Sequence, residues 1–135
     1  MAAERVEADV AIAIDTTAVS DTPEETMDQT LFLGQGTGIK IIDFSLIAHP
    51  AVKETLVDLA KKHTIPFQFE VFPGIGTDGG AVSLANKGIP TGVLSIPSRY
   101  AHSPVEVIDL KDLEATKNLL KQFILSTENS SFSFI

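Results

Sequence analysis

Two residues of this chain combine metal-ligand chemistry with a setting at the end of an apolar segment. Asp15 follows the apolar run 11–14, and His102 follows shortly after the apolar run 91–96. Carboxylate oxygen and imidazole nitrogen are donors that zinc, cobalt and manganese accept in hydrolytic sites. Two ligands are too few to hold a catalytic metal ion, so a working site would need others.

Asp15 and the other two histidines of the chain also have ordinary structural explanations. Asp15 ends an apolar segment, where a buried carboxylate is costly unless it is paired or bound to a metal ion. A turn residue satisfied by backbone amides explains Asp15 equally well. His49 and His63 flank an amphipathic helix and are more simply a cap and an end residue than ligands. Asp15, Asp78 and His102 each follow an apolar strand. Open α/β sheets place their chemistry at strand carboxyl ends, which would bring these three to one edge.

The elements that must position these residues alternate between strands and helices. We expect strands over residues 9–14, 38–43, 67–72 and 91–96, the last with both faces buried. We expect a helix from Pro50 to about residue 63 and a short helix that ends near Lys87. A final helix should be capped by Asp109 and should face inward through Leu113, Leu120, Phe123 and Ile124. This alternation predicts an α/β layer fold with a largely parallel sheet.

The composition limits the class of protein. A chain of 135 residues is one domain or part of one, and its net charge of −8 argues against binding a nucleic-acid backbone. The absence of cysteine excludes disulfides and thiolate metal sites. No apolar run reaches the length of a membrane span, and no secretory signal begins the chain. We therefore expect a soluble, cytoplasmic protein with no membrane partner.

The glycine-rich turn at residues 74–79 (GIGTDG) matches the dinucleotide-binding pattern G-x-G-x-x-G, between a strand and a helix. Asp78 argues against that function, because its charge would repel a pyrophosphate at the helix N-terminus. Arg99 stands where an acidic residue would bind the ribose, and the turn lies late in the chain. We favour a tight turn with Asp78 as a helix cap.

Four ordered blocks resemble a known family: residues 14–23 (IDTTAVSDTP), 76–81 (GTDGGA), 88–92 (GIPTG) and 99–107 (RYAHSPVEV). Together they resemble the C-terminal catalytic segment of the glutamyl and tetrahedral (TET) aminopeptidases. These are two-metal metallopeptidases, some of which are also labelled cellulase-M-like. The resemblance runs from about residue 3 to about residue 125. It implies a zinc-exopeptidase-like three-layer α/β sandwich with a mostly parallel sheet.

The resemblance also implies roles for individual residues. Asp15 matches the terminal aspartate ligand of one divalent metal ion, zinc or cobalt, and His102 matches the late histidine ligand of the other. Asp78 matches a position that lines the substrate side or supports the ligands. Arg99 and Glu106 flank His102 and would orient its imidazole, since metal-bound imidazoles usually have a partner on the other nitrogen.

The chain departs from the family pattern in what it lacks. The first histidine ligand, the bridging aspartate and the Glu-Glu pair that contains the general base belong to a region that would precede Met1. We therefore expect residues 1–127 to be the C-terminal part of a catalytic domain and residues 128–135 a tail. Alone, the chain would supply one ligand to each metal and no catalytic residue. Activity on peptide substrates would need a second polypeptide with the N-terminal half.

Further expectations follow from the resemblance, and two alternatives stay open. The family's habit implies a homo-oligomer, and the similarity of residues 16–23 to glutamyl aminopeptidases hints at acidic N-terminal residues in the substrate. The first alternative is a non-catalytic α/β remnant or binding module in which Asp15 and His102 are structural. A nucleotide-binding oxidoreductase is a more distant alternative.

Overall fold

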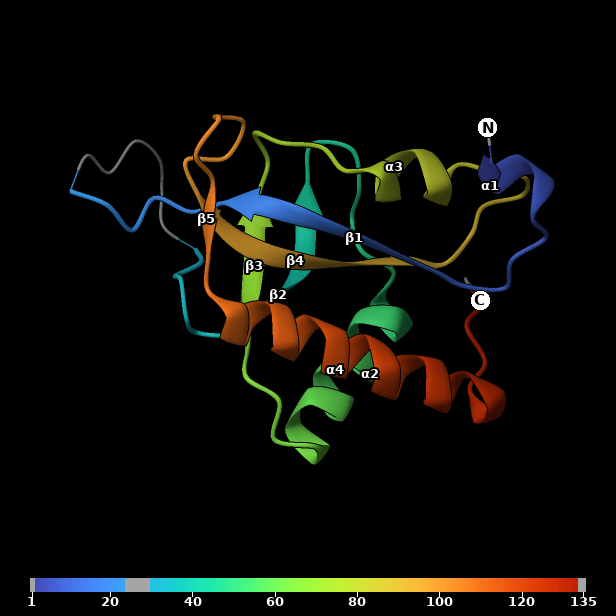
Figure 1. Cartoon of the computed structure of the whole chain (residues 1–135). Helices are drawn as coiled ribbons and strands as arrows, with labels where there is room; N and C mark the ends of the chain where they lie inside the picture. Colours follow the sequence, from blue (N-terminus) through green and yellow to red (C-terminus); the bar gives the residue numbers. More distant parts are fainter. Residues whose placement is uncertain (1, 24–29, 134–135) are drawn as a thin grey trace.

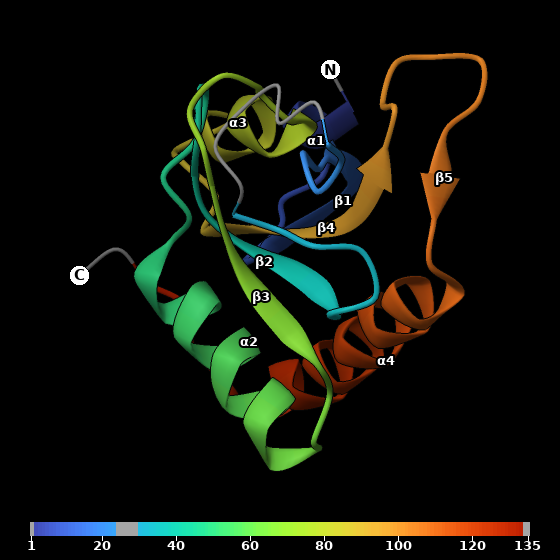
Figure 2. The ribbon, with the colours of Figure 1, turned by 90° about the vertical axis from the view of Figure 1, so that its left-hand side faces the viewer.

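A mixed five-stranded sheet forms the centre of the molecule, with helices on both of its faces (Figures 1 and 2). The computed structural model describes residues 2–23 and 30–133. In chain order the elements are α1 (Ala2–Arg5), β1 (Ala11–Ala18), β2 (Thr37–Asp43), α2 (Pro50–Lys62), β3 (Phe67–Phe72), α3 (Asp78–Ser83), β4 (Thr91–Arg99), β5 (Val107–Ile108), α4 (Leu110–Ser126) and the 3₁₀ turn η1 (Thr127–Asn129).

The strand order is β1-β4-β2-β3, and β5 pairs with the end of β4. The two long ladders, β1 with β4 and β2 with β3, are parallel. They meet at a short antiparallel junction, where Gly38 lies opposite Ser95 and Ile39 opposite Leu94. The largely parallel α/β sheet predicted from the sequence is therefore confirmed, and the antiparallel junction at its centre is an addition. Figure 1 shows β1 and β4 crossing β2 and β3 steeply.

The molecule has three layers, with the sheet between two layers of helices. Helices α2 and α4 cover one face, while α3 lies over the other (Figures 1 and 2). Successive residues of a strand point to opposite faces. Ile39 and Leu94 therefore pack on Val52, Leu56 and Leu119 in the main core, while the neighbouring residues face α3.

The starts of α2 and α4 agree with the sequence. Helix α2 begins at Pro50, with His49 as N-cap and His63 as C-cap, as a first-turn proline favours. Asp109 caps α4, and its Oδ1 accepts a hydrogen bond from the Lys111 backbone N at 2.8 Å. Both caps therefore confirm the prediction.

Strands β1 and β4 extend further than expected, and this changes the setting of Asp15. We predicted that the first strand ends at Ile14, but β1 continues to Ala18. The polar residues that follow Ile14 stay in the strand because the parallel ladder with β4 continues to the pair Ala18–Ser98. Asp15 therefore lies within β1, opposite Ser95. A tertiary partner has overridden the local turn signal.

Two predictions about helix α3 were wrong, those of its last residue and of its N-cap. It ends at Ser83 and not near Lys87, and its N-cap is Thr77, so Asp78 is the first helical residue and not the cap. The glycine pattern has a packing explanation here. A Cβ atom on Gly79 would lie 2.8 Å from Val93 Cγ2, so glycine lets α3 approach β4 closely.

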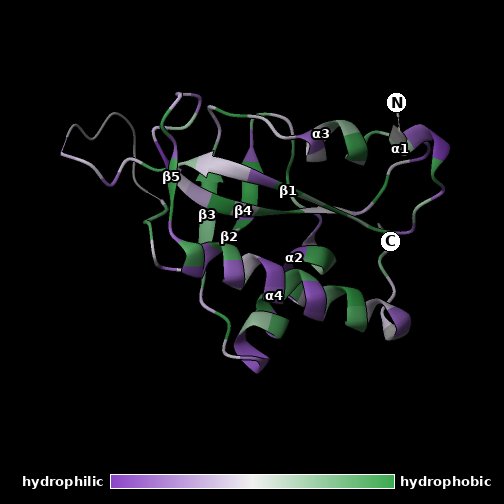
Figure 3. Cartoon of the chain, in the orientation of Figure 1, coloured by the Kyte–Doolittle hydropathy of each residue, from purple (hydrophilic) through white to green (hydrophobic). Residues whose placement is uncertain are grey.

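The inward face of α4 was predicted only in part. Phe123 is buried as expected, but Leu113 is 40% exposed and Ile124 is 59% exposed. The helix is rotated because the fully buried Asp112 accepts hydrogen bonds from the backbone N atoms of Gly34 and Gly36, both at 2.7 Å. The alternation of polar and apolar bands along α4 is visible in Figure 3, but it did not reveal a carboxylate on the buried face.

The segment after α4 returns to the core. The Phe132 ring lies 5.6 Å from the Phe123 ring, measured between centroids, and it packs against the main core. The last two residues of the predicted tail, 134 and 135, lie outside the described residues. Among the described helices, none combines the length and the apolar character needed to cross a bilayer.

Candidate metal centre

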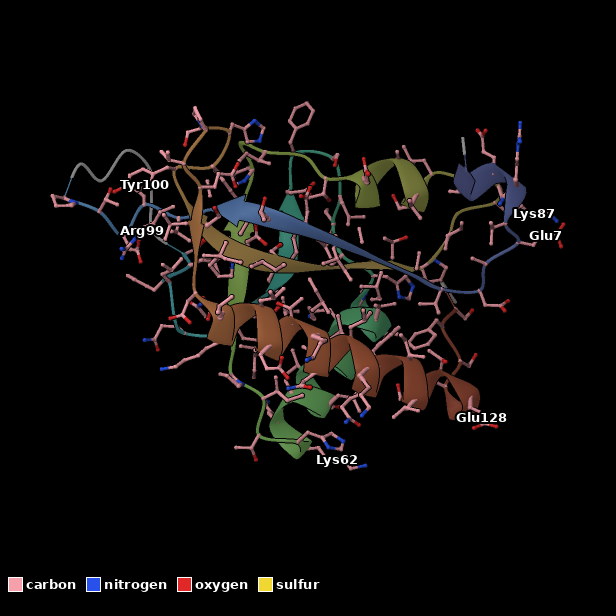
Figure 4. All side chains as sticks on the ribbon, viewed as in Figure 1. Glu7, Lys62, Lys87, Arg99, Tyr100 and Glu128 are labelled. Atoms are coloured by element: carbon pink, nitrogen blue, oxygen red, sulfur yellow. The ribbon has the colours of Figure 1, made fainter. Side chains whose placement is uncertain are left out.

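A cavity of about 580 Å³ lies where β1, the turn before α3 and the loop after β4 come together. Asp15 and His102 both line it, so the structure brings the two predicted ligands to one site. The rest of the lining is uncharged: Thr16, Ala18, Ile75, Gly76 and Ala101. Figure 4 shows the side chains around this end of β1.

Asp15 is exposed on β1, and its backbone is fixed by the parallel ladder with β4. Its Oδ1 accepts a hydrogen bond from the Thr16 backbone N at 2.8 Å. This local bond holds one carboxylate oxygen and sets the plane of the group. An exposed carboxylate of fixed orientation is a suitable donor for a hard or borderline cation.

His102 lies in a tight loop between β4 and β5 that the Glu106 side chain closes. Glu106 Oε1 accepts a hydrogen bond from the His102 backbone N at 2.8 Å, and Oε2 accepts one from Ser98 Oγ at 3.1 Å. Tyr100 and His102 have left-handed backbones, with φ of 59° and 64°. Such a conformation costs about 1 kcal/mol for a residue with a Cβ. The carboxylate of Glu106 therefore holds the loop in a strained shape with His102 at the cavity.

The guanidinium group of Arg99 is bound by Asp21. Its Nε and Nη2 atoms donate to the two carboxylate oxygens of Asp21, at 2.6 and 3.1 Å, and Figure 4 shows Arg99 beyond the end of β1. The hydrogen bond to Arg99 lowers the pKa of Asp21 below its ordinary value, and the same bond raises the pKa of Arg99. The pair ties the segment after β1 to the end of β4.

Asp78 stands at the start of α3 and is exposed. The turn that carries it contributes Ile75 and Gly76 to the cavity, but Asp78 itself is not among the lining residues. Its role on the substrate side stays a prediction.

The donor set fits part of a metal site but not a whole one. One carboxylate and one imidazole face the same cavity, and both are donors that zinc and cobalt accept. Within residues 2–23 and 30–133, no group of three or more His, Cys, Asp or Glu side chains is placed to hold a metal ion. The described residues therefore supply too few ligands for a closed site.

A buried charged network that contacts β1 and the turn before α3 was not predicted from the sequence. Lys40, Asp43 and Glu70 have fully buried side chains. Lys40 Nζ donates to Glu70 Oε1 at 2.8 Å and lies 3.6 Å from Asp43 Oδ2. Thr17 Oγ1, on the strand that carries Asp15, donates to the same Glu70 oxygen at 2.7 Å. The network thus ties β1 to β2 and β3.

The same network reaches the turn before α3 through Asp43. Its Oδ1 accepts from the backbone N atoms of Ser45 and Leu46, at 2.7 and 2.8 Å, and from Ser45 Oγ at 2.9 Å. Thr77 Oγ1 donates to Oδ2 at 2.9 Å. Burial raises the pKa of Asp43, but the hydrogen bonds from Ser45 and Thr77 and the charge of Lys40 outweigh it, so the pKa is lowered.

These carboxylates predict a stability that falls in acid. Asp21 and Asp43 have pKa values below 3.8 in the folded chain, so the unfolded chain binds protons first as the pH drops. The free energy of unfolding should be constant above about pH 5 and should fall as the pH passes through the folded pKa values. Urea unfolding between pH 6 and pH 3 measures this. Asp43→Asn should flatten the decline, and an unchanged slope would contradict the role given to Asp43.

Comparisons with known proteins converge on one family. The M42 glutamyl aminopeptidase family matches residues 1–119. An aminopeptidase structure from the archaeon Desulfurococcus kamchatkensis is 45% identical, with a TM-score of 0.86, over 91% of this chain and 36% of that one. The Pyrococcus horikoshii TET1 peptidase, described as able to assemble into a tetrahedron or a large octahedral shell, is 30% identical, with a TM-score of 0.64, over 83% of this chain and 32% of that one.

A curated relative, the glutamyl aminopeptidase of Lactococcus lactis, is 32% identical over 118 residues, which are 87% of this chain and 32% of that protein. The chain spans about a third of the length of the curated relatives it matches.

Proposed function

Because the chain belongs to the M42 glutamyl aminopeptidase family, we propose that it forms part of the active site of a metal-dependent aminopeptidase. Asp15 supplies one ligand to one divalent metal ion, zinc or cobalt, and His102 supplies one ligand to the other. The observation that carries the proposal is the cavity in which strand β1 and the loop after β4, distant in sequence, present these two donors together.

The other residues of the site have supporting roles in this proposal. Glu106 fixes the loop that carries His102, and Asp78 lies beside the turn that borders the cavity. The metal ions would polarise the peptide carbonyl and provide hydroxide at neutral pH. The general base and the remaining ligands come from residues outside this sequence, in a longer protein or in a second polypeptide.

The sheet offers a place for those missing residues. In the part of the chain that the structure describes, β1 pairs with β4 alone, so its outer edge has free backbone N–H and C=O groups. An open edge strand is a template for pairing with another strand. We place the complementary segment along this edge, beside Asp15. The relative that assembles into shells supports a homo-oligomer for the completed protein.

A hybrid protein tests this function. Residues 1–127 would replace the matching segment of the Lactococcus lactis glutamyl aminopeptidase, and aminoacyl p-nitroanilide hydrolysis would be measured with added zinc or cobalt. The hybrid should turn over substrate, because it contains both sets of ligands. The isolated chain should show no turnover, because the loss of several members of a catalytic unit leaves only residual rate enhancement.

Two results would contradict the proposal. Turnover by the isolated chain that His102→Ala abolishes would mean that the chain assembles a complete site alone. A hybrid that has the circular dichroism of a folded protein but neither binds metal nor turns over substrate would favour the alternative, a non-catalytic α/β module.

A further inference from the structure

Strand β3 lies at the opposite end of the strand order from β1, and its outer edge is also open. In the described part of the chain, β3 pairs with β2 alone. Its sequence, FQFEVF, contains no proline and no lysine, two residues that commonly block pairing at an edge strand. A segment added along β1 would leave this second edge free. The edge of β3 is therefore a template for a further strand.

The face of β3 that lies beside α2 is apolar and only half covered. Phe69 is 50% exposed and Val71 is 45% exposed, and the two share this face because alternate residues of a strand point the same way. The Phe69 ring packs edge-on against Phe67, with 5.5 Å between the ring centroids. A cavity of about 620 Å³ lies between Phe69, Ile41 and Val57, where α2 runs beside β3 (Figure 2). An apolar groove thus adjoins the open edge.

Four charged residues of α2 line the same groove: Lys53, Glu54, Asp58 and Lys61. None of these four side chains forms an ion pair with another residue in the ranges 2–23 and 30–133. Helical periodicity places the two acids in one row, at i and i+4, and the two lysines in the adjacent row, at i and i+8. The groove therefore presents unpaired charges of both signs beside an apolar floor, as the rim of a protein interface does.

This arrangement of charges complements itself. A two-fold axis at the outer edge of β3, level with Phe69, brings the β3 strands of two copies together antiparallel, with both α2 helices on one face of the joined sheet. Val57 shares the groove with Phe69, so the axis also passes level with the middle of α2. Glu54 of each copy then lies opposite Lys61 of the other. Self-complementarity of this kind is what a two-fold interface requires.

We propose that β3 and α2 form a docking surface for a second copy of this chain, in which two sheets join through antiparallel β3 strands. Backbone hydrogen bonds along the edge, burial of Phe69 and Val71, and the two Glu54–Lys61 pairs stabilise the dimer. The groove shares no lining residue with the candidate metal centre, so this inference goes beyond the proposed function and does not depend on it. The edge of β1 stays accessible in the dimer.

Sedimentation velocity of the purified chain over a range of concentrations tests this surface. The unaltered chain should dimerise. Phe69→Lys should raise the dimer dissociation constant at least about tenfold, because two ammonium groups replace two apolar rings beside the axis. Ile14→Lys is the matched control, since Ile14 is 46% exposed on the other edge strand, β1. It should leave the dissociation constant unchanged.

An exchange of charges on α2 tests whether the partner is a second copy. Lys61→Glu should weaken the dimer, because it places acidic residues opposite one another on both sides of the axis. Lys61→Glu combined with Glu54→Lys should restore the dimer, because each pair is reversed and kept. Both residues are exposed, so the fold should not change, and circular dichroism and the urea midpoint check this.

Four results would overturn the inference. The first is an unaltered chain that stays monomeric up to about 100 μM, and the second is a dimer that Phe69→Lys leaves intact. The third is a dimer that Ile14→Lys dissociates and Phe69→Lys does not, which would place the contact on β1. The fourth is a double variant as weakly associated as Lys61→Glu alone, which would contradict the two-fold arrangement of α2.

Discussion

Lys40→Met should destabilise the folded chain by about 3–5 kcal/mol, the effect expected when one partner of a buried ion pair is removed. The side chains of Lys40, Asp43 and Glu70 are fully buried, so the substitution leaves two carboxylates facing one another without the ammonium group between them. Asp43 keeps four hydrogen-bond donors, whereas Glu70 keeps only the hydroxyl of Thr17. Urea unfolding at pH 7 measures the loss.

Two further variants separate charge from volume in that result. Lys40→Met combined with Glu70→Gln should recover much of the lost free energy, because the charge of Glu70 is gone while Thr17 keeps its acceptor, and Asp43 keeps its four hydrogen-bond donors. Lys117→Met removes an exposed ion pair with Glu114 on α4 and should leave the urea midpoint nearly unchanged, since such pairs contribute little. A Lys40→Met protein as stable as the parent would show that the buried network does not stabilise the fold.

The buried network also shows where sequence patterns stop being informative. Lys40 and Glu70 occupy polar positions in strands of alternating pattern, residues 37–43 and 67–72, and such positions are usually exposed. Alternation gives the face of a sheet but not what covers it. Here β1 and the turn before α3 cover that face, through Thr17 and Thr77. These contacts join residues far apart in the chain, so no local pattern could reveal them.

The elements that could be predicted are those whose signals are local. Helix α2 and strand β3 were placed closely because a proline start and a clean alternation need no distant partner. The inward face of α4 was misjudged because Asp112 is buried by amides of a loop 76 residues earlier. The extent of β1 depended on its ladder with β4. Asp15 and His102 line one cavity because β1 and β4 are parallel neighbours, so the end of β1 lies beside the loop that follows β4. The sequence indicated this edge of the sheet, although Asp15 lies within β1 and does not follow it.

His102→Ala in the hybrid should remove one metal ion per active site and lower kcat/KM on the order of a hundredfold or more, because partners that merely support a ligand are already worth 10- to 100-fold. The imidazole is the donor that this chain offers from the loop after β4, and His102 lines the same cavity as Asp15. Metal content by atomic absorption after dialysis, together with anilide hydrolysis, measures both effects.

The control for this variant is His63→Ala, which removes an exposed histidine at the end of α2 and should change neither metal content nor rate. Asp15→Asn should also lose one metal ion, the one that His102 does not hold, so each single variant keeps one ion and the double variant keeps none. If His102→Ala and His63→Ala behaved alike, His102 would be no ligand. If Asp15→Asn alone released both ions, the two metal sites would depend on each other, and the assignment of Asp15 to one ion alone would be contradicted.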